Sequence, residues 1–303
     1  MPLTQTPFIR ILTEVMDNMF DVMALDVLQS FGSACKAHRK WVIEYLRRRK
    51  RCLLAKFIAD LASFDDTLRA TSSVISGSVA LQFLLPQDAT RWPSTDLDIY
   101  TTAAGYKGVA DALLCEKYIL ISTGSSRPCY TQSTIRTVFT FAKGGLRIDV
   151  VISASACAIL PIFQFHSTIV MNYLSADSFF SAYPLFTNQF RGLVNPMSMK
   201  DGRHTMKVVC ALVKYENRGF SINASANDWE SEDEEEHECR DNVCCPHYIR
   251  ATNDVACARV VLEESASVQS EDWDAGDDVV MWRLGGETCD EADNASVPYV
   301  FVL

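Results

Sequence analysis

Residues 74–100 constrain the fold more than any other stretch of the chain. Gly77-Ser78 comes first and opens an apolar run, residues 79–85, which predicts a buried helix. A loop containing a proline follows, and after it the segment T-D-L-D-I-Y places Asp96 and Asp98 two residues apart. Alternate side chains of a strand share a face, so both acids point one way while their apolar neighbours point into the core. Two adjacent carboxylates repel unless a cation lies between them, and Mg²⁺ is the natural candidate.

A third acid lies on another predicted strand. Residues 135–142 and 146–153 are rich in β-branched and aromatic residues, and the Lys-Gly-Gly between them predicts a hairpin. Asp149 stands in the middle of the second run. A buried lone carboxylate is costly, so we expect it to have a partner or a metal ion. The Gly77-Ser78 turn at a helix start offers N–H groups and a hydroxyl to a phosphate.

Together these residues resemble the signature of the nucleotidyltransferase superfamily, which has the DNA polymerase β-like fold. The matching segments are Ile75-Ser76-Gly77-Ser78, Thr95-Asp96-Leu97-Asp98-Ile99 and Arg147-Ile148-Asp149-Val150-Val151. The resemblance covers about residues 70–155. The segment Phe165-His166-Ser167-Thr168 is also similar to a group of fungal nucleotidyltransferase-like proteins without an assigned reaction. One departure is the long spacer between Ser78 and Asp96, whose extra residues fall in the loop 86–95 and predict a remodelled substrate side.

The resemblance implies a metal-dependent transfer of a nucleoside monophosphate from a nucleoside triphosphate, such as ATP, to an unknown hydroxyl acceptor. It implies that Asp96 and Asp98 ligate two Mg²⁺ or Mn²⁺ ions and that Asp149 ligates one and activates the acceptor. Gly77 and Ser78 would then bind the triphosphate. The alternative is a catalytically silent module of the same fold that binds a nucleotide, a nucleic acid or a protein partner.

We expect an α+β fold, with a nucleotidyltransferase-like mixed sheet and flanking helices. The expected regions are an N-terminal helical region (1–70), the core (71–196), a helical segment packing on it (197–227), an acidic loop (228–241) and a small C-terminal β-rich segment (242–303). Apolar spacing predicts helices over about 7–31 and 34–62, near 107–115, and over 203–217. Strand candidates in the last region are 257–262, 279–284 and 299–302.

The net charge of −10 hides a division along the chain. Residues 1–220 hold 24 Lys or Arg against 17 Asp or Glu, whereas residues 221–303 hold four against 21. Most of the basic residues of the second predicted helix fall between 36 and 56. A nucleic-acid-binding surface is one interpretation of this run, and an ordinary solvated helix face is the other. Its members are Lys36, Arg39, Lys40, Arg47, Arg48, Arg49, Lys50, Arg51 and Lys56.

Three further groups are weaker candidates. Lys207 and Lys214 lie on one side of the predicted helix 203–217 and are either triphosphate contacts or surface lysines. His166 follows the strand of Asp149 and is either near the active site or a hydrogen-bonded core residue. The Cys/His cluster between 237 and 257 includes zinc-type ligands, but no paired Cys-x2-Cys spacing, so reduced structural thiols are the competing interpretation.

Composition predicts the compartment. No uninterrupted apolar stretch of about 20 residues is present, so we expect no membrane-spanning helix. The first residues lack the basic start and apolar centre of a secretion signal. Eleven scattered cysteines fit reduced thiols. We therefore expect an intracellular protein, cytoplasmic or nuclear.

Overall fold

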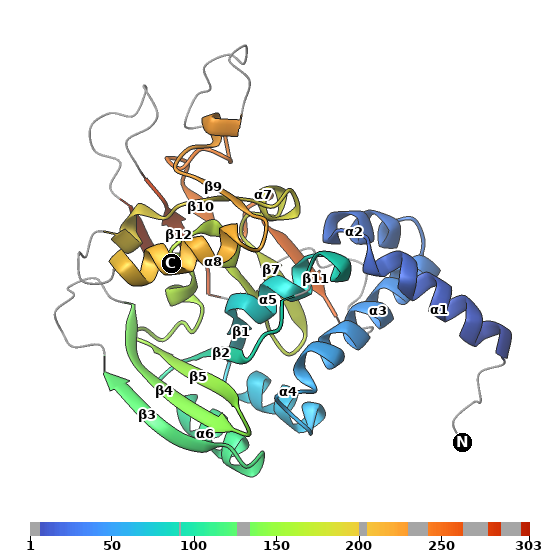
Figure 1. Ribbon diagram of the computed structural model, residues 1–303, viewed down its shortest axis with the longest axis horizontal. Helices are drawn as coiled ribbons and strands as arrows, with labels where there is room; N and C mark the ends of the chain where they lie inside the picture. Colours follow the sequence, from blue (N-terminus) through green and yellow to red (C-terminus); the bar gives the residue numbers. More distant parts are fainter. Residues whose placement is uncertain are drawn as a thin grey trace.

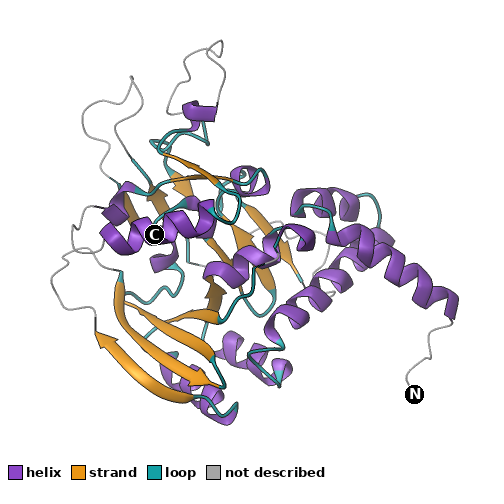
Figure 2. Ribbon diagram, viewed as in Figure 1, coloured by secondary structure: helices purple, strands orange, loops and turns teal. Residues whose placement is uncertain are grey.

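The computed structural model describes residues 7–90, 92–125, 134–199, 205–229, 242–262, 278–285 and 298–303. It is an α+β structure in which helices lie on both sides of a large mixed sheet (Figures 1 and 2). The helices are α1 Pro7–Asp21, α2 Leu25–Ser33, α3 Lys36–Leu54, α4 Leu61–Ala70, α5 Gly77–Leu84, α6 Tyr106–Cys115, α7 Pro184–Asn188 and α8 Thr205–Glu216. The strands are β1 Val74–Ser76, β2 Asp96–Thr101, β3 Ile119–Ser125, β4 Ile135–Lys143, β5 Leu146–Ser153, β6 Asn172–Leu174, β7 Ser178–Ser181, β8 Arg191–Leu193, β9 Ser221–Asn223, β10 Arg250–Ala251, β11 Ala258–Val261, β12 Val280–Arg283 and β13 Tyr299–Val302.

The main sheet has eight strands in the order β11-β7-β6-β1-β2-β5-β4-β3. Strand β2 runs antiparallel to β1 and parallel to β5, so the end of β1 meets the beginnings of β2 and β5 at one edge. Strands β4 and β5 form the predicted hairpin, and both glycines of its turn, Gly144 and Gly145, have positive φ. Alternate residues of β2 belong to two separate apolar clusters, with Leu97 and Ile99 in one and Tyr100 in the other. Both faces of the sheet are therefore packed.

The N-terminal region breaks more often than its apolar spacing predicts. The expected helix 7–31 is two helices, because α1 ends at Asp21 and the extended backbone of Ala24 precedes α2. The expected helix 34–62 stops at Leu54, and Asp60 caps the start of α4 by accepting a hydrogen bond from the Ser63 N–H at 3.1 Å. Apolar residues between α3 and α4, such as Ile58, are buried but not helical, and their spacing continues the apolar pattern of α3. The single-helix predictions were wrong for this reason.

The basic run on α3 is largely used inside the protein. Arg49 is buried and donates to the carbonyl oxygens of Gln82, at 2.9 Å, and Leu85, at the end of α5. Lys50 is also buried, and its Nζ lies 2.8 Å from an Asp65 oxygen and 3.2 Å from the Ser175 carbonyl. These two cations bind the helix to the sheet domain, so the prediction of one exposed basic surface over 36–56 was wrong for them.

Other basic residues of the same run have protein partners as well. Arg48 pairs with Asp17, Arg47 donates to the Leu262 carbonyl, and Lys56, just after α3, donates to the Ser94 carbonyl. Lys40 faces Glu44 at 3.9 Å on the exposed side. A nucleic-acid contact through the rest of the run, which includes the exposed Lys36 and Arg51, stays a prediction.

The C-terminal β-rich segment is divided between two sheets. Its strand β11 pairs with β7 and forms one edge of the main sheet, while β10, β12 and β13 form a separate three-stranded sheet. All three strand candidates, 257–262, 279–284 and 299–302, are strands. Most of the predicted acidic loop, residues 230–241, lies outside the described residues. Across the described parts of the chain, none of the helices has the length and apolar character needed to cross a bilayer.

Candidate active site

The turn from β1 to α5 lies against the acid-bearing strand. Gly77 has a φ of +68°, a backbone conformation that glycine adopts without a steric penalty. A Cβ atom at this position would lie 2.3 Å from Oδ2 of Asp98, so the site leaves no room for a side chain. Ser76, immediately before it, is the register neighbour of Asp98 across the β1–β2 pair. Gly77 therefore allows the start of α5, with Ser78, to approach the carboxylate.

The parallel pairing of β2 and β5 brings the second and third acids together. Asp98 is the register neighbour of Asp149, and Asp96 is the neighbour of Arg147. Leu97 and Ile99 on either side of Asp98 are fully buried, so the predicted alternation of β2 is confirmed. Side chains at neighbouring register positions of a sheet point to the same face. The three acids consequently share one face at the edge where β1 ends.

Asp98 is the electrostatic centre of the group. Burial, which is the largest cause, and the carboxylates of Asp149 and Asp96 together raise its pKa to about 7, while Lys214 and Arg147 act in the opposite direction. Asp98 is thus a carboxyl group that titrates near neutral pH. A cation beside it would relieve both the burial cost and the repulsion.

Arg147 already binds Asp149. Its Nε lies 3.0 Å from Oδ1 and its Nη2 lies 2.6 Å from Oδ2 of that carboxylate, a bidentate pair. The Arg147 side chain is 53% exposed and that of Asp149 is 16% exposed. The hydrogen bonds to Asp149 raise the pKa of the guanidinium. The i, i+2 spacing of Arg147 and Asp149 on one strand is the signal in the sequence that could have predicted this pair.

The carboxylate oxygens have the chemistry for Mg²⁺ or Mn²⁺, but they are not gathered into a metal site in this arrangement. Among the described residues, no three His, Cys, Asp or Glu side chains are grouped closely enough to hold a metal ion. Asp149 is turned onto Arg147, and Asp96 is exposed at the beginning of β2. Metal binding by all three acids thus requires Asp149 to exchange Arg147 for the ion.

Helix α8 faces the acids with a basic and aromatic surface. Burial lowers the pKa of Lys214, and Arg218 lowers it further, whereas Asp98 and Asp96 raise it, so this lysine lies within the field of the acids. Tyr215 is buried beside it, and the Arg218 guanidinium lies 5.1 Å from the Tyr215 ring and 4.8 Å from that of Trp92. Sequence reasoning did not identify Tyr215, Arg218 or Trp92, because aromatic residues at these spacings are indistinguishable from core residues.

The two candidate lysines of α8 have different surroundings. His166 lies close to the side of α8 that faces the acids. Lys214 interacts with the acids, while Lys207 is an exposed residue near the start of α8. The imidazole of His166 lies 5.5 Å from the Tyr215 ring. Burial lowers its pKa to about 4, and Lys214 contributes in the same direction, so it is neutral at pH 7. His166 is partly buried and its Nδ1 has no hydrogen-bond partner, so the hydrogen-bonded core interpretation is not confirmed, and a role near the active site stays a prediction.

The zinc candidate is only partly described. His237 and Cys239 lie outside the described residues. Of the others, Cys257 interacts with Arg250, whose Nη2 lies 3.3 Å from its Sγ, and Cys245 accepts a hydrogen bond from the His247 N–H at 3.4 Å. Both sulfurs thus have protein contacts of the kind expected of structural thiols.

Comparison with known proteins does not assign this chain to a family. The chain matches no family model, no curated protein and no solved structure. The fold and the site are therefore interpreted from the residues alone.

Replacing Arg147 with Gln is expected to increase the affinity for Mn²⁺ by about tenfold, because the variant frees Asp149 and removes a competing cation. Electron paramagnetic resonance of free Mn²⁺ during titration measures this affinity without requiring activity. Arg136→Gln is the matched control, since Arg136 is an exposed arginine of the neighbouring strand β4. An unchanged or lower affinity in Arg147→Gln would show that Arg147 does not compete with the ion.

Proposed function

We propose that the protein is a metal-dependent nucleotidyltransferase that moves a nucleoside monophosphate from a nucleoside triphosphate to a hydroxyl acceptor. One observation carries the proposal: Asp98 and Asp149 are register neighbours on parallel strands, and the Gly77 turn is pressed against Asp98. A glycine turn at a helix start beside paired acids supports phosphate binding next to a metal site. The class of the acceptor stays open.

The roles follow from the positions of the residues. Asp96 and Asp98 would hold Mg²⁺ or Mn²⁺, and Asp149 would join them after releasing Arg147. Such ions, when bound, would supply positive charge that stabilises the phosphoryl transfer. Asp149 would accept the proton of the acceptor hydroxyl. The N–H groups at the start of α5, with the Ser78 hydroxyl, would bind the triphosphate.

The direct test is incubation of the full-length protein with labelled nucleoside triphosphates, Mg²⁺ or Mn²⁺, and a cell lysate as the pool of acceptors. Label transfer and pyrophosphate release are the two measurements. The proposal requires label transfer and pyrophosphate release by the native protein. It requires that both are lost when Asp96, Asp98 or Asp149 is replaced. Activity that persists in Asp98→Asn would show that the reaction does not take place at this site.

A silent nucleotide-binding module is the second candidate, and the Arg147–Asp149 pair favours it. Arg147 supplies a positive charge to Asp149 where the catalytic arrangement needs a metal ion. A silent module would bind a nucleoside triphosphate with little dependence on Mg²⁺ and release no pyrophosphate. Binding measured by calorimetry with and without EDTA distinguishes it from the enzyme.

Replacing Lys214 with Met is expected to raise KM for the nucleoside triphosphate about tenfold with a smaller change in kcat, because a lysine facing the acids would stabilise phosphate charge. Lys207→Met is the matched control on the same helix and should change neither value. Steady-state kinetics over a range of nucleotide concentrations provides both constants. Equal effects of the two substitutions would exclude a specific contact by Lys214.

A further inference from the structure

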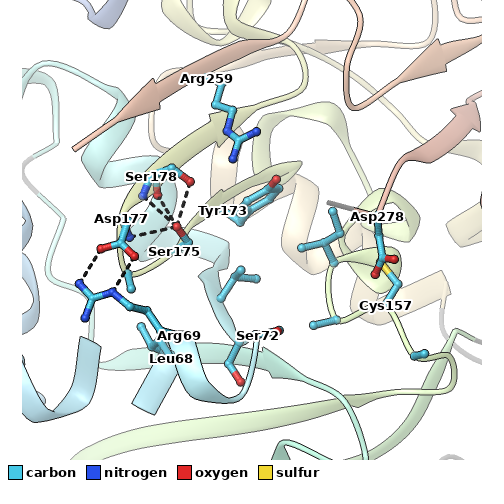
Figure 3. A pocket seen from close by; sticks show the side chains of 16 residues that line it. Leu68, Arg69, Ser72, Cys157, Tyr173, Ser175, Asp177, Ser178, Arg259 and Asp278 are labelled. Carbon is cyan, nitrogen blue, oxygen red and sulfur yellow. Dashed lines mark hydrogen bonds and ion pairs between the residues drawn. The ribbon is translucent and has the colours of Figure 1, made fainter. Parts of the chain in front are cut away.

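Helix α3 divides its cations between an inner and an outer side. Lys50 is buried and donates to the Ser175 carbonyl of the β6–β7 turn at 3.2 Å. Figure 3 shows this turn, in which Arg69 binds Asp177 through two hydrogen bonds. Arg49 is buried as well and donates to the end of α5. These contacts fix which side of α3 faces the sheet and which side faces outward.

Three exposed cations follow the outer side of α3. They are Lys36, Lys40 and Arg51. Their spacings are four and eleven residues, so all three lie along one face of a helix with about 3.6 residues per turn. The stripe is about 22 Å long, because an α-helix rises about 1.5 Å per residue. The outer side of α3 therefore presents a row of positive charge.

The stripe has one acid beside it. An oxygen of Glu44 lies 3.9 Å from the Nζ of Lys40, and the two side chains are 41% and 61% exposed. An exposed pair of this kind contributes little to stability and is screened by salt. Lys40 can therefore exchange Glu44 for another anion at small cost.

A column of stacked rings ends beside this stripe. Phe31 of α2 stacks on His38 of α3, with ring centroids 4.2 Å apart and an interplanar angle of 8°. His38 stacks in turn on Trp41, with centroids 5.6 Å apart and an angle of 23°. Trp41 is 39% exposed and follows Lys40 directly in the sequence. The indole is thus supported by protein rings while part of it faces solvent.

Cations beside a supported, exposed ring match the chemistry of a single-stranded nucleic acid. Phosphates bind exposed lysine and arginine side chains, and unpaired bases stack on aromatic side chains. The bases of a duplex already stack on one another, so a duplex would use only the cations. An ordinary solvated helix face explains the three cations, but it does not explain a supported indole exposed among them.

We propose that the outer side of α3 binds single-stranded nucleic acid, with Lys36, Lys40 and Arg51 on its phosphates and Trp41 stacked on a base. RNA and DNA share this chemistry. The surface belongs to the N-terminal helices, whereas the candidate active-site acids lie on β2 and β5 (Figure 1). The inference therefore does not depend on nucleotidyl transfer.

The test is fluorescence anisotropy of the full-length protein in EDTA with labelled oligouridylate, oligothymidylate and a DNA duplex, each about 12 nucleotides long. We expect single strands to bind at least about tenfold more tightly than the duplex. Their affinity should fall with salt, with a slope of about −2 in log K against log salt for three phosphate contacts. Binding of only one of the two strands supports the proposal and assigns the ligand to RNA or to DNA. Equal binding of the duplex, or binding that salt does not change, overturns it.

Variants separate the indole from the cations. Trp41→Ala should weaken single-strand binding by about tenfold without changing the salt slope, because only stacking is lost. Trp41→Phe keeps a ring and should retain most of the binding. Lys36→Gln and Arg51→Gln should each reduce the magnitude of the slope by about 0.7. Lys107→Gln, at an exposed lysine of α6, is the control and should change neither value. Unchanged binding in Trp41→Ala, or an unchanged slope in both charge variants, would refute the proposal.

An anionic membrane is the competing ligand, since a tryptophan beside lysines also suits a charged lipid surface. Vesicles containing phosphatidylserine are the probe for it. Weaker vesicle binding in Trp41→Ala, together with unchanged oligonucleotide binding, would assign the surface to lipid and overturn the proposal.

One further variant keeps this inference apart from the proposed nucleotidyl transfer. Asp98→Asn should leave oligonucleotide binding unchanged, because Asp98 lies on β2 and the titration contains no metal ion. Loss of transfer in that variant with intact oligonucleotide binding would confirm that the two sites are separate. Failure of one proposal therefore leaves the other testable.

Discussion

Replacing Asp98 with Asn is expected to reduce nucleotidyl transfer by about a thousandfold, which corresponds to about 4 kcal/mol of lost transition-state stabilisation. The amide keeps the shape of the carboxyl group but cannot supply its charge. The measurement is pyrophosphate release at saturating nucleoside triphosphate with Mg²⁺. Residual activity within tenfold of the native protein would contradict the role given to Asp98.

The same substitution is expected to stabilise the metal-free fold at alkaline pH. Asp98 has a pKa of about 7 in the folded protein and a reference value of 3.8, so the folded state holds its proton more tightly than the unfolded state does. Ionising it therefore costs stability as pH rises from the lower value to the higher, and the full cost applies above both. The amide avoids this cost, which is on the order of 2–4 kcal/mol.

Urea unfolding in EDTA measures the effect. Asp98→Asn should be more stable than the native protein at about pH 8, and the difference should vanish toward about pH 4. Asp111→Asn, at an exposed acid of α6, is the control and should be neutral throughout. If the free energies of unfolding of the native protein and of Asp98→Asn run parallel with pH, folding does not raise the pKa of Asp98.

Replacing Gly77 with Ala is expected to destabilise the protein by about 2–4 kcal/mol and to abolish transfer. Two costs combine. The φ of +68° is unfavourable for alanine by about 1–2 kcal/mol. The new Cβ would also lie 2.3 Å from Oδ2 and 3.3 Å from Cγ of Asp98, so the acid would have to move.

Matched substitutions separate these two costs. Gly144→Ala has the backbone cost alone, since Gly144 has a φ of +56° and nothing lies within 4 Å of its added Cβ. In an Asp98→Ala background the nearest remaining Asp98 atom, Cβ, is at 3.6 Å, so Gly77→Ala should cost about as much as Gly144→Ala. Chemical unfolding of the single and double variants provides the comparison. Equal costs of Gly77→Ala in both backgrounds would mean that Asp98 does not press on this turn.

Much of the sheet around the acids was predictable. The hairpin 135–153 and the burial of Leu97 and Ile99 follow from the alternation of apolar residues and from the Lys-Gly-Gly turn. The alternation also placed Asp96 and Asp98 on one face. Short strands with strict alternation have one register that buries their apolar residues, and such strands can therefore be predicted from the sequence.

The unpredicted features depend on contacts between distant residues. Nothing local distinguishes Arg49 and Lys50, which are buried, from Arg51 beside them, which is exposed. The position of β11 at the edge of the main sheet depends on its pairing with β7, about eighty residues earlier, and strand composition does not encode partners. The contact between Arg147 and Asp149 could have been predicted from the sequence, because the two residues share a strand face.

The buried cations of α3 have a consequence for synthesis of the chain. Arg49 finds its carbonyl partners 33 and 36 residues later, and Lys50 finds two of its own 125 and 126 residues later. Since translation proceeds from the N-terminus, α3 leaves the ribosome long before these partners exist. Until about residue 176 has been made, Lys50 lacks these two carbonyl partners, while α1 and α2 already pack against α3. The docking of α3 onto the sheet is therefore completed only after β6 has been made.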